Sequence, residues 1–141
     1  MIDVAAQPAI EVRQAWPQDQ AFVAATFREQ LARQHSLAGY GAADRIVDRI
    51  LDSDRTRVVV AVDGKRLIGW LAYVEMPRVR ALLFAYVRKE HRSHGVARQM
   101  ARMAWPRATG QWVHAGLRGG STRQLLEKFS TSLEMPLEEM L

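Results

Sequence analysis

Residues 79–104 constrain the fold most strongly, because an apolar strand, a short polar loop and an amphipathic helix follow one another there. The run 79–87 is almost wholly apolar, which is typical of a central strand covered on both faces. The loop after it has the form Arg-x-x-Gly-x-Ala, filled by Arg92, Gly95 and Ala97. The helix that follows has an apolar stripe made of Val96, Met100 and Met103.

This strand, loop and helix predict a binding site for a diphosphate. Several backbone N–H groups of such a loop point at one spot at the positive end of the helix dipole, where an anion is stabilised. Gly95 lets a ligand approach the backbone closely, and Ala97 keeps the start of the helix small. The plainer interpretation is a strand-to-helix turn that contains a glycine and binds nothing.

The same residues resemble the GNAT superfamily of acyl-CoA N-acyltransferases. Its pattern is a strand ending in Val and then Arg/Gln-x-x-Gly-x-Gly/Ala at the start of a helix. The resemblance covers most of the chain and is specific around residues 79–104. It implies that acetyl-CoA is the cosubstrate and that the loop 92–98 holds its pyrophosphate. The residues implied in cofactor binding are Tyr86, Val87, Arg92, Ser93, His94, Gly95, Val96, Ala97 and Arg98.

Hydrophobic periodicity and turn signals predict the other elements of a single domain that spans residues 1–141. Helices are expected at 18–34, 42–52 and 95–105 and from residue 119 onward, and strands at 9–15, 57–62, 66–75, 79–87 and 111–117. Asp63-Gly64 predicts a tight hairpin between two of these strands.

The resemblance implies an α/β (α+β) fold of three layers, the GNAT-like fold. In it, helices cover both faces of a mixed, mostly antiparallel central sheet. We expect the strands 79–87 and 111–117 to run parallel, joined by a right-handed crossover through the helix 95–105.

The end of the sequence departs from the family pattern. After the fourth helix the family usually adds two more strands, whereas only residues 130–141 remain here. We therefore expect truncated C-terminal strands and an open sheet edge with unpaired N–H and C=O groups. Either a homodimer or larger assembly covers this edge, or the tail folds back over it. The apolar residues available for this are Leu133, Met135, Leu137, Met140 and Leu141.

The residues expected to carry the chemistry also depart from the family. Acetyl transfer to an amine needs a neutral amine near the thioester carbonyl, a group that stabilises the oxyanion, and a proton donor for the departing thiolate. In the family a strand N–H polarises the carbonyl, and backbone groups near residues 85–87 fit this role. The family's usual base, a Glu or His on the fourth strand, has no counterpart, since residues 81–85 carry no ionisable side chain.

The family's usual general acid is missing as well. It is a Tyr in the fourth-helix pattern Asn-x-x-Ala-x-x-Leu-Tyr-x-Lys, which residues 119–128 follow with Leu126 at the Tyr position and Thr122 at the Ala position. Glu75 and His114 are the nearest substitutes and are our candidates for catalytic residues. The plainer interpretations are a solvated strand end for Glu75 and a hydrogen-bonded strand histidine for His114.

Composition narrows the class of protein. The absence of cysteine excludes disulfides, a thiolate zinc site and a Cys nucleophile. Glu90, His91 and His94 all lie in one short loop, so we expect no metal site. The N-terminus lacks a signal peptide and no apolar run is long enough to span a bilayer, so we expect a cytoplasmic protein without membrane contact. A net charge of +5 and a pI of about 10.2 favour polyanions such as nucleic acid or a CoA phosphate.

Three functions are open from the sequence. The first is a CoA-dependent N-acetyltransferase whose amine acceptor lies on a small molecule, a protein or a nucleobase. The second is a GNAT-fold protein without acetylation activity, a structural or partner-binding component of an assembly such as a phage particle. The third, favoured by charge alone, is a basic nucleic-acid-binding domain.

Overall fold

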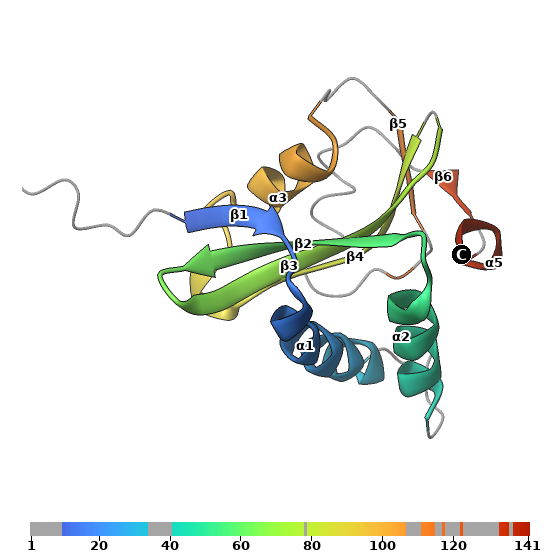
Figure 1. Ribbon diagram of the computed structural model, residues 1–141, viewed down its shortest axis with the longest axis horizontal. Helices are drawn as coiled ribbons and strands as arrows, with labels where there is room; N and C mark the ends of the chain where they lie inside the picture. Colours follow the sequence, from blue (N-terminus) through green and yellow to red (C-terminus); the bar gives the residue numbers. More distant parts are fainter. Residues whose placement is uncertain are drawn as a thin grey trace, which may run out of the picture.

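The computed structural model describes residues 10–33, 41–77, 79–106, 111–114, 117, 122, 133–135 and 137–141. Within these residues the backbone forms one six-stranded sheet in the order β1-β2-β3-β4-β5-β6, with helices on both of its faces (Figure 1). The predicted α/β fold of three layers is confirmed. No helix in these parts of the chain is both long enough and apolar enough to cross a bilayer.

Neighbouring strands are mostly antiparallel. β1 to β4 pair antiparallel in chain order, whereas β5 joins β4 and β6 joins β5 in parallel. The parallel pairing of β4 with β5 confirms the prediction for the strands 79–87 and 111–117. The strands are β1 (Ile10–Gln14), β2 (Thr56–Asp63), β3 (Arg66–Glu75), β4 (Val79–Val87), β5 (Gln111–His114) and β6 (Leu133–Glu134).

β2 and β3 form the hairpin that Asp63-Gly64 predicts. Asp63 pairs with Arg66, so the turn consists of Gly64 and Lys65 alone. Gly64 has a φ of 63°, a left-handed conformation that glycine adopts without a steric penalty. The hairpin tip therefore holds Asp63 in place, and its carboxylate contacts His91 in the loop after β4.

The helices divide between the two faces of the sheet (Figure 1). α1 (Gln20–Ala32) and α2 (Ala42–Asp52) lie on one face, and α3 (Val96–Ala104) lies on the other. The bounds of α2 are those predicted, and α3 falls within the predicted helix. The first helix is shorter than predicted, because a 3-10 turn, η2 (Pro17–Asp19), precedes α1 and bonds Asp19 N–H to the carbonyl of Trp16. The helix predicted from residue 119 lies outside the described residues, apart from Thr122.

β4 separates the two halves of the hydrophobic core. Residues 81–85 are at most 2% exposed, as expected for a strand covered on both faces. On the α1 and α2 side, the rings of Phe27, Trp70 and Phe84 pack with centroids 4.9 to 5.8 Å apart. The α3 side includes Leu71, Leu82, Ala85 and Met100. Burying one such large side chain contributes about 1.5–3 kcal/mol, so this packing fixes β4 firmly within the sheet.

The C-terminal residues lie against the sheet of their own chain. Leu133 and Glu134 form β6 beside β5, and Met135 N–H donates to the carbonyl of His114 at 2.8 Å. α5 (Leu137–Met140) follows and buries Met140 in the core on the α1 and α2 side. Of the two outcomes expected for the C-terminal residues, the structure shows the one in which they fold back beside their own sheet. Pairing with a second copy stays a prediction.

Candidate functional site

A β-bulge in β4 lies beside the last described pair of β4 and β5. Ala72 of β3 pairs with Phe84 and Tyr73 pairs with Leu82, so Leu83 is skipped and β4 bends. The described register with β5 runs from Val79 and Gln111 to Leu82 and His114. The candidate site is built on β4 from Leu83 to Val87, which lies beyond this register.

The loop after β4 is held by its arginines. Arg88 donates from its backbone N–H to the carbonyl of Ile68 and from Nε to the carbonyl of Leu67, both at 2.7 Å. Arg92 donates from Nε to the carbonyl of Val87 at 2.9 Å. These bonds fasten the loop, including its 3-10 turn η4 (Lys89–His91), to the ends of β3 and β4. The loop enters α3 in a fixed direction as a result.

α3 begins at a left-handed glycine with open space around it. Gly95 is the cap residue with a φ of 79°, and a Cβ placed there would meet no atom within 4 Å. No side chain bonds this cap, and the first turn of α3 carries no acidic residue. Ser93, two residues earlier, has a φ of 66°, which is strained for a side chain other than glycine. The helix start is thus positive, uncapped by side chains and open, as a site for an anion requires.

The β2–β3 hairpin contacts the same loop through two polar pairs. His91 Nε2 lies 3.2 Å from Asp63 Oδ2, and Arg66 lies 3.6 Å from the Glu90 carboxylate. The backbone N–H of Glu90 and then the charge of Arg66 hold the pKa of the Glu90 carboxyl below its ordinary value. His91 therefore acts as a brace of the loop, while His94 is exposed.

The two candidate catalytic residues lie on opposite sides of β4, at pairing positions two residues apart. Glu75 ends β3 opposite Arg80, and its carboxylate accepts a hydrogen bond from the Arg80 guanidinium at 2.8 Å. His114 lies in β5 opposite Leu82, roughly 7 Å farther along β4. Glu75 is exposed at the end of its strand, whereas His114 is 2% exposed at the last described pair of β4 and β5.

Tyr86, which the resemblance placed among the cofactor residues, turns its side chain toward α1. Its ring centroid lies 6.4 Å from that of Phe22 and 6.2 Å from that of Trp70. Its carbonyl oxygen lies only 2.7 Å from where a Cβ on Gly69 would stand, so β3 approaches β4 closely there. The carbonyl of Tyr86 therefore faces β3, while its ring faces α1.

Thr122 is the residue of this site that sequence reasoning did not select. It is completely buried, and its Oγ1 accepts a hydrogen bond from the backbone N–H of Ala85 at 2.7 Å. The only signal in the sequence is a Thr at a position where the family pattern has Ala. That signal shows a departure from the pattern but not the contact, which joins residues 37 positions apart.

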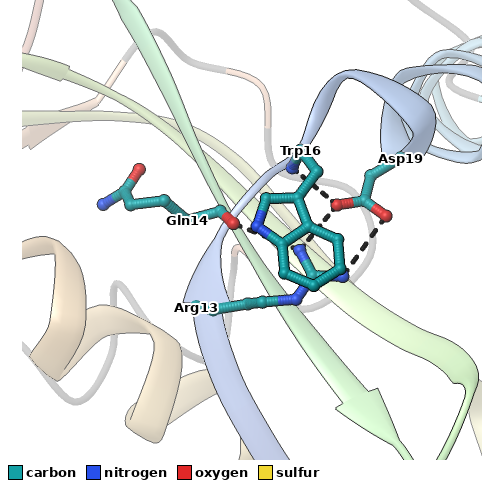
Figure 2. A network of polar contacts seen from close by, with 4 residues as sticks. All are labelled: Arg13, Gln14, Trp16 and Asp19. Atoms are coloured by element: carbon teal, nitrogen blue, oxygen red, sulfur yellow. Dashed lines mark hydrogen bonds and ion pairs between the residues drawn. The ribbon is translucent and has the colours of Figure 1, made fainter.

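A polar network fixes the start of α1 beside the site (Figure 2). Asp19 is buried and accepts hydrogen bonds from Arg13 Nη1 and from Trp16 N–H, both at 2.7 Å. The Arg13 guanidinium also lies 3.5 Å from the centroid of the Trp16 ring. Burial raises the pKa of the Asp19 carboxyl, but the hydrogen bonds from Arg13 and Trp16 and the charge of Arg13 outweigh it and lower that pKa. The fixed α1 presents Phe22, over which the Arg88 guanidinium lies at 4.8 Å.

This arrangement agrees with the family to which the chain is matched. A model of the acetyltransferase (GNAT) family matches residues 11–117, most of the chain, so the protein belongs to the GNAT acetyltransferases. The resemblance predicted from residues 79–104 is confirmed. No curated protein matches the sequence.

Solved structures share the fold. One is a ribosomal-protein-alanine N-acetyltransferase from Brucella melitensis biovar Abortus. Its alignment covers 90% of this chain and 95% of that protein, with a TM-score of 0.61 and 17% identity. The aminoglycoside N-acetyltransferase AAC(6')-Iy, bound to a bisubstrate analog, covers 92% and 95%, with a TM-score of 0.58 and 15% identity. A GNAT family acetyltransferase from Brucella melitensis in complex with acetyl-CoA covers 77% of each chain, with a TM-score of 0.58 and 18% identity. At these identities the likeness is one of fold.

Proposed function

We propose that this protein transfers the acetyl group of acetyl-CoA to the amine of an acceptor. The observation that carries the proposal is the run of β4 from Leu83 to Val87, which lies beyond the described pairing with β5 and leads into the open start of α3. Membership of the GNAT family supports it. So do the neighbours of the same fold that are complexed with coenzyme A or acetyl-CoA.

The described residues offer a binding place for each of two parts of acetyl-CoA, the pantetheine arm and the diphosphate. The pantetheine arm, which carries amide groups, would lie along residues 83–87 and pair with their backbone as an added strand does. The diphosphate would meet the N–H groups at Gly95, Val96 and Ala97, with Arg92 and Arg98 nearby. The thioester carbonyl would then accept a hydrogen bond from a backbone N–H between residues 85 and 87, where negative charge develops on its oxygen.

The reaction we propose is direct attack of a neutral amine on the thioester. The amine nitrogen bonds to the carbonyl carbon, the carbon–sulfur bond breaks, and the departing thiolate takes up a proton. His114 would accept the proton that the amine loses, directly or through one water molecule. Its burial beside Leu82 of β4 supports this role, whereas Glu75 is exposed at the end of β3.

Binding and turnover test the proposal separately. Acetyl-CoA should raise the thermal midpoint in a concentration-dependent way, because it binds the native state alone. A panel of amines, from polyamines and aminoglycosides to peptides, should then include one that releases free CoA thiol. His114→Gln should lower kcat about a hundredfold while leaving acetyl-CoA affinity unchanged. The same loss with Glu75→Gln, and none with His114→Gln, would reassign the base.

One observation favours a second candidate, a GNAT-fold binding module without acetylation activity. Thr122 already holds the N–H of Ala85, one of the groups that a thioester carbonyl would need. A protein that shows no thermal shift with millimolar acetyl-CoA would be this module, because its strand edge would be filled by its own side chain.

A further inference from the structure

A side chain of the same protein takes one backbone N–H of β4 beyond Leu82. Thr122 Oγ1 lies 2.7 Å from the Ala85 nitrogen and 3.5 Å from the Ala85 carbonyl oxygen. Thr122 has no exposed surface, and Ala85 has none either. The short distance to the nitrogen makes this a well-formed hydrogen bond in which the hydroxyl accepts.

An alanine at position 122, the residue of the family pattern, could not make this contact. The hydroxyl is therefore a property of this chain rather than of the fold. A backbone N–H is a single donor, and at 2.7 Å its acceptor occupies the direction in which the hydrogen points. A carbonyl oxygen of acyl-CoA and the Thr122 hydroxyl cannot both take the Ala85 N–H.

We propose that Thr122 is a self-occluding residue that competes with acyl-CoA for the backbone N–H of Ala85. The inference rests on the proposed function, since it requires the acyl-CoA arm to lie on β4. Binding then has to turn the Thr122 side chain away before the thioester carbonyl reaches this N–H. A typical intramolecular hydrogen bond is worth a factor of roughly three to ten in an equilibrium constant, so the hydroxyl weakens acyl-CoA binding by about that factor.

Three variants and two ligands test this competition by isothermal titration calorimetry. Thr122→Val removes the hydroxyl and keeps the branched shape, Thr122→Ala restores the residue of the family pattern, and Thr122→Ser keeps a hydroxyl. Adenosine 3′-phosphate 5′-diphosphate lacks the pantetheine arm and reports on the diphosphate loop alone. We expect acetyl-CoA to bind Thr122→Val and Thr122→Ala about three- to tenfold more tightly than the parent. Thr122→Ser should match the parent, and the nucleotide should bind all four proteins equally.

The outcomes separate the two proposals. If acetyl-CoA and the nucleotide bind neither the parent nor any variant, the proposed function fails and the competition fails with it. If both ligands bind the parent but the variants that lack the hydroxyl bind acetyl-CoA no more tightly, the competition is overturned and the proposed function stands.

A measurement on the parent protein keeps the competition falsifiable even if the variants fold poorly. In the free protein, NMR should show a nuclear Overhauser contact between the Ala85 amide proton and the Thr122 side chain. Saturation with acetyl-CoA should abolish this contact while the Ala85 amide stays protected from hydrogen exchange, because one acceptor replaces another. A contact that persists unchanged at saturation would overturn the proposal.

Discussion

α2 and α3 begin with the same backbone conformation and differ in what surrounds it. Gly41 caps α2 with a φ of 80°, and Gly95 caps α3 with a φ of 79°. Neither cap receives a hydrogen bond from a side chain. In both, the N–H four residues on closes the first turn, with Arg45 donating to Gly41 at 2.9 Å and Gln99 donating to Gly95 at 3.0 Å.

The surroundings decide what each helix start can bind. The first turn of α2 contains Asp44, which lies 3.6 Å from Arg28 of α1. The equivalent position in α3 is Arg98, and no acidic residue lies in that turn. The positive end of α2 is therefore balanced by its own chain, whereas that of α3 is available to an anion from outside. A glycine cap becomes a candidate phosphate site only where the chain supplies no carboxylate of its own.

The largest effect should come from filling the two caps in turn. Gly95→Val puts a branched side chain into the space beside the α3 amides, and we expect acetyl-CoA affinity to fall by at least about a hundredfold, or ~2.7 kcal/mol. Gly41→Val is the control for backbone strain, about 1–2 kcal/mol for a left-handed non-glycine residue, although its Cβ would also lie 3.2 Å from the Arg45 guanidinium. Calorimetric titration of both variants measures the difference. Equal affinities would mean that the diphosphate binds elsewhere.

The next effect concerns β3, which pairs with the strand that leads into the α3 cap. Gly69→Ala forces a Cβ toward the carbonyl oxygen of Tyr86, which would be only 2.7 Å away if the backbone did not move. Overpacking of this kind costs about 1–3 kcal/mol, and we expect a loss of stability of about 2 kcal/mol. Urea unfolding measures it. A variant as stable as the parent would show that β3 and β4 separate easily at this point.

Placing an acidic residue in the first turn of α3 should make its N-terminus as poor an anion site as that of α2. Arg98→Asp gives α3 the acidic residue that α2 has, and we expect acetyl-CoA affinity to fall about tenfold, or ~1.4 kcal/mol. Arg102→Asp makes the same charge change in the last turn of α3 and controls for net charge. A similar loss in both variants would point to long-range attraction instead of a local anion site. Raising the salt concentration should then weaken binding of the parent as much as either substitution.

The smallest effect concerns the start of α1, where Asp19 and Arg13 form an ion pair (Figure 2). The folded state lowers the pKa of Asp19, so this carboxylate contributes stability above its unfolded pKa of about 3.9. That contribution is lost as the pH falls through the lowered folded pKa. Asp19→Asn should lower the free energy of unfolding by about 1 kcal/mol at neutral pH. It should also make that free energy depend less steeply on pH in the acid range. Denaturant titrations between pH 2 and 7, roughly spanning both pKa values, measure the slope, and an unchanged slope would contradict the assignment.

Local sequence was sufficient to predict the segment that defines the family. The apolar run 79–87, the glycine at 95 and the helical stripe after it are short-range patterns, and β4 and α3 follow them closely. The hairpin at Gly64 and the bounds of α2 were predictable for the same reason. In each case neighbouring residues set the backbone conformation, so no distant contact was needed.

The choice between the candidate catalytic residues could not be made in this way. Glu75 and His114 are both candidates in the sequence, since each is an ionisable residue on a strand. In the structure His114 is buried opposite Leu82, whereas Glu75 is exposed opposite Arg80, two residues nearer the start of β4. Burial follows from how whole strands and helices pack, and it is not written in any short pattern.

By itself, the sequence determined the family, the strand–loop–helix unit and the left-handed turn at Gly95, because periodicity and glycine conformation act over a few residues. The tertiary structure alone decided that Thr122 meets Ala85, that Asp19 pairs with Arg13 while buried, and that the tail covers β5. The physical reason is that a buried N–H, carboxylate or strand edge must find a partner. Which partner it finds depends on how strands and helices distant in sequence pack together.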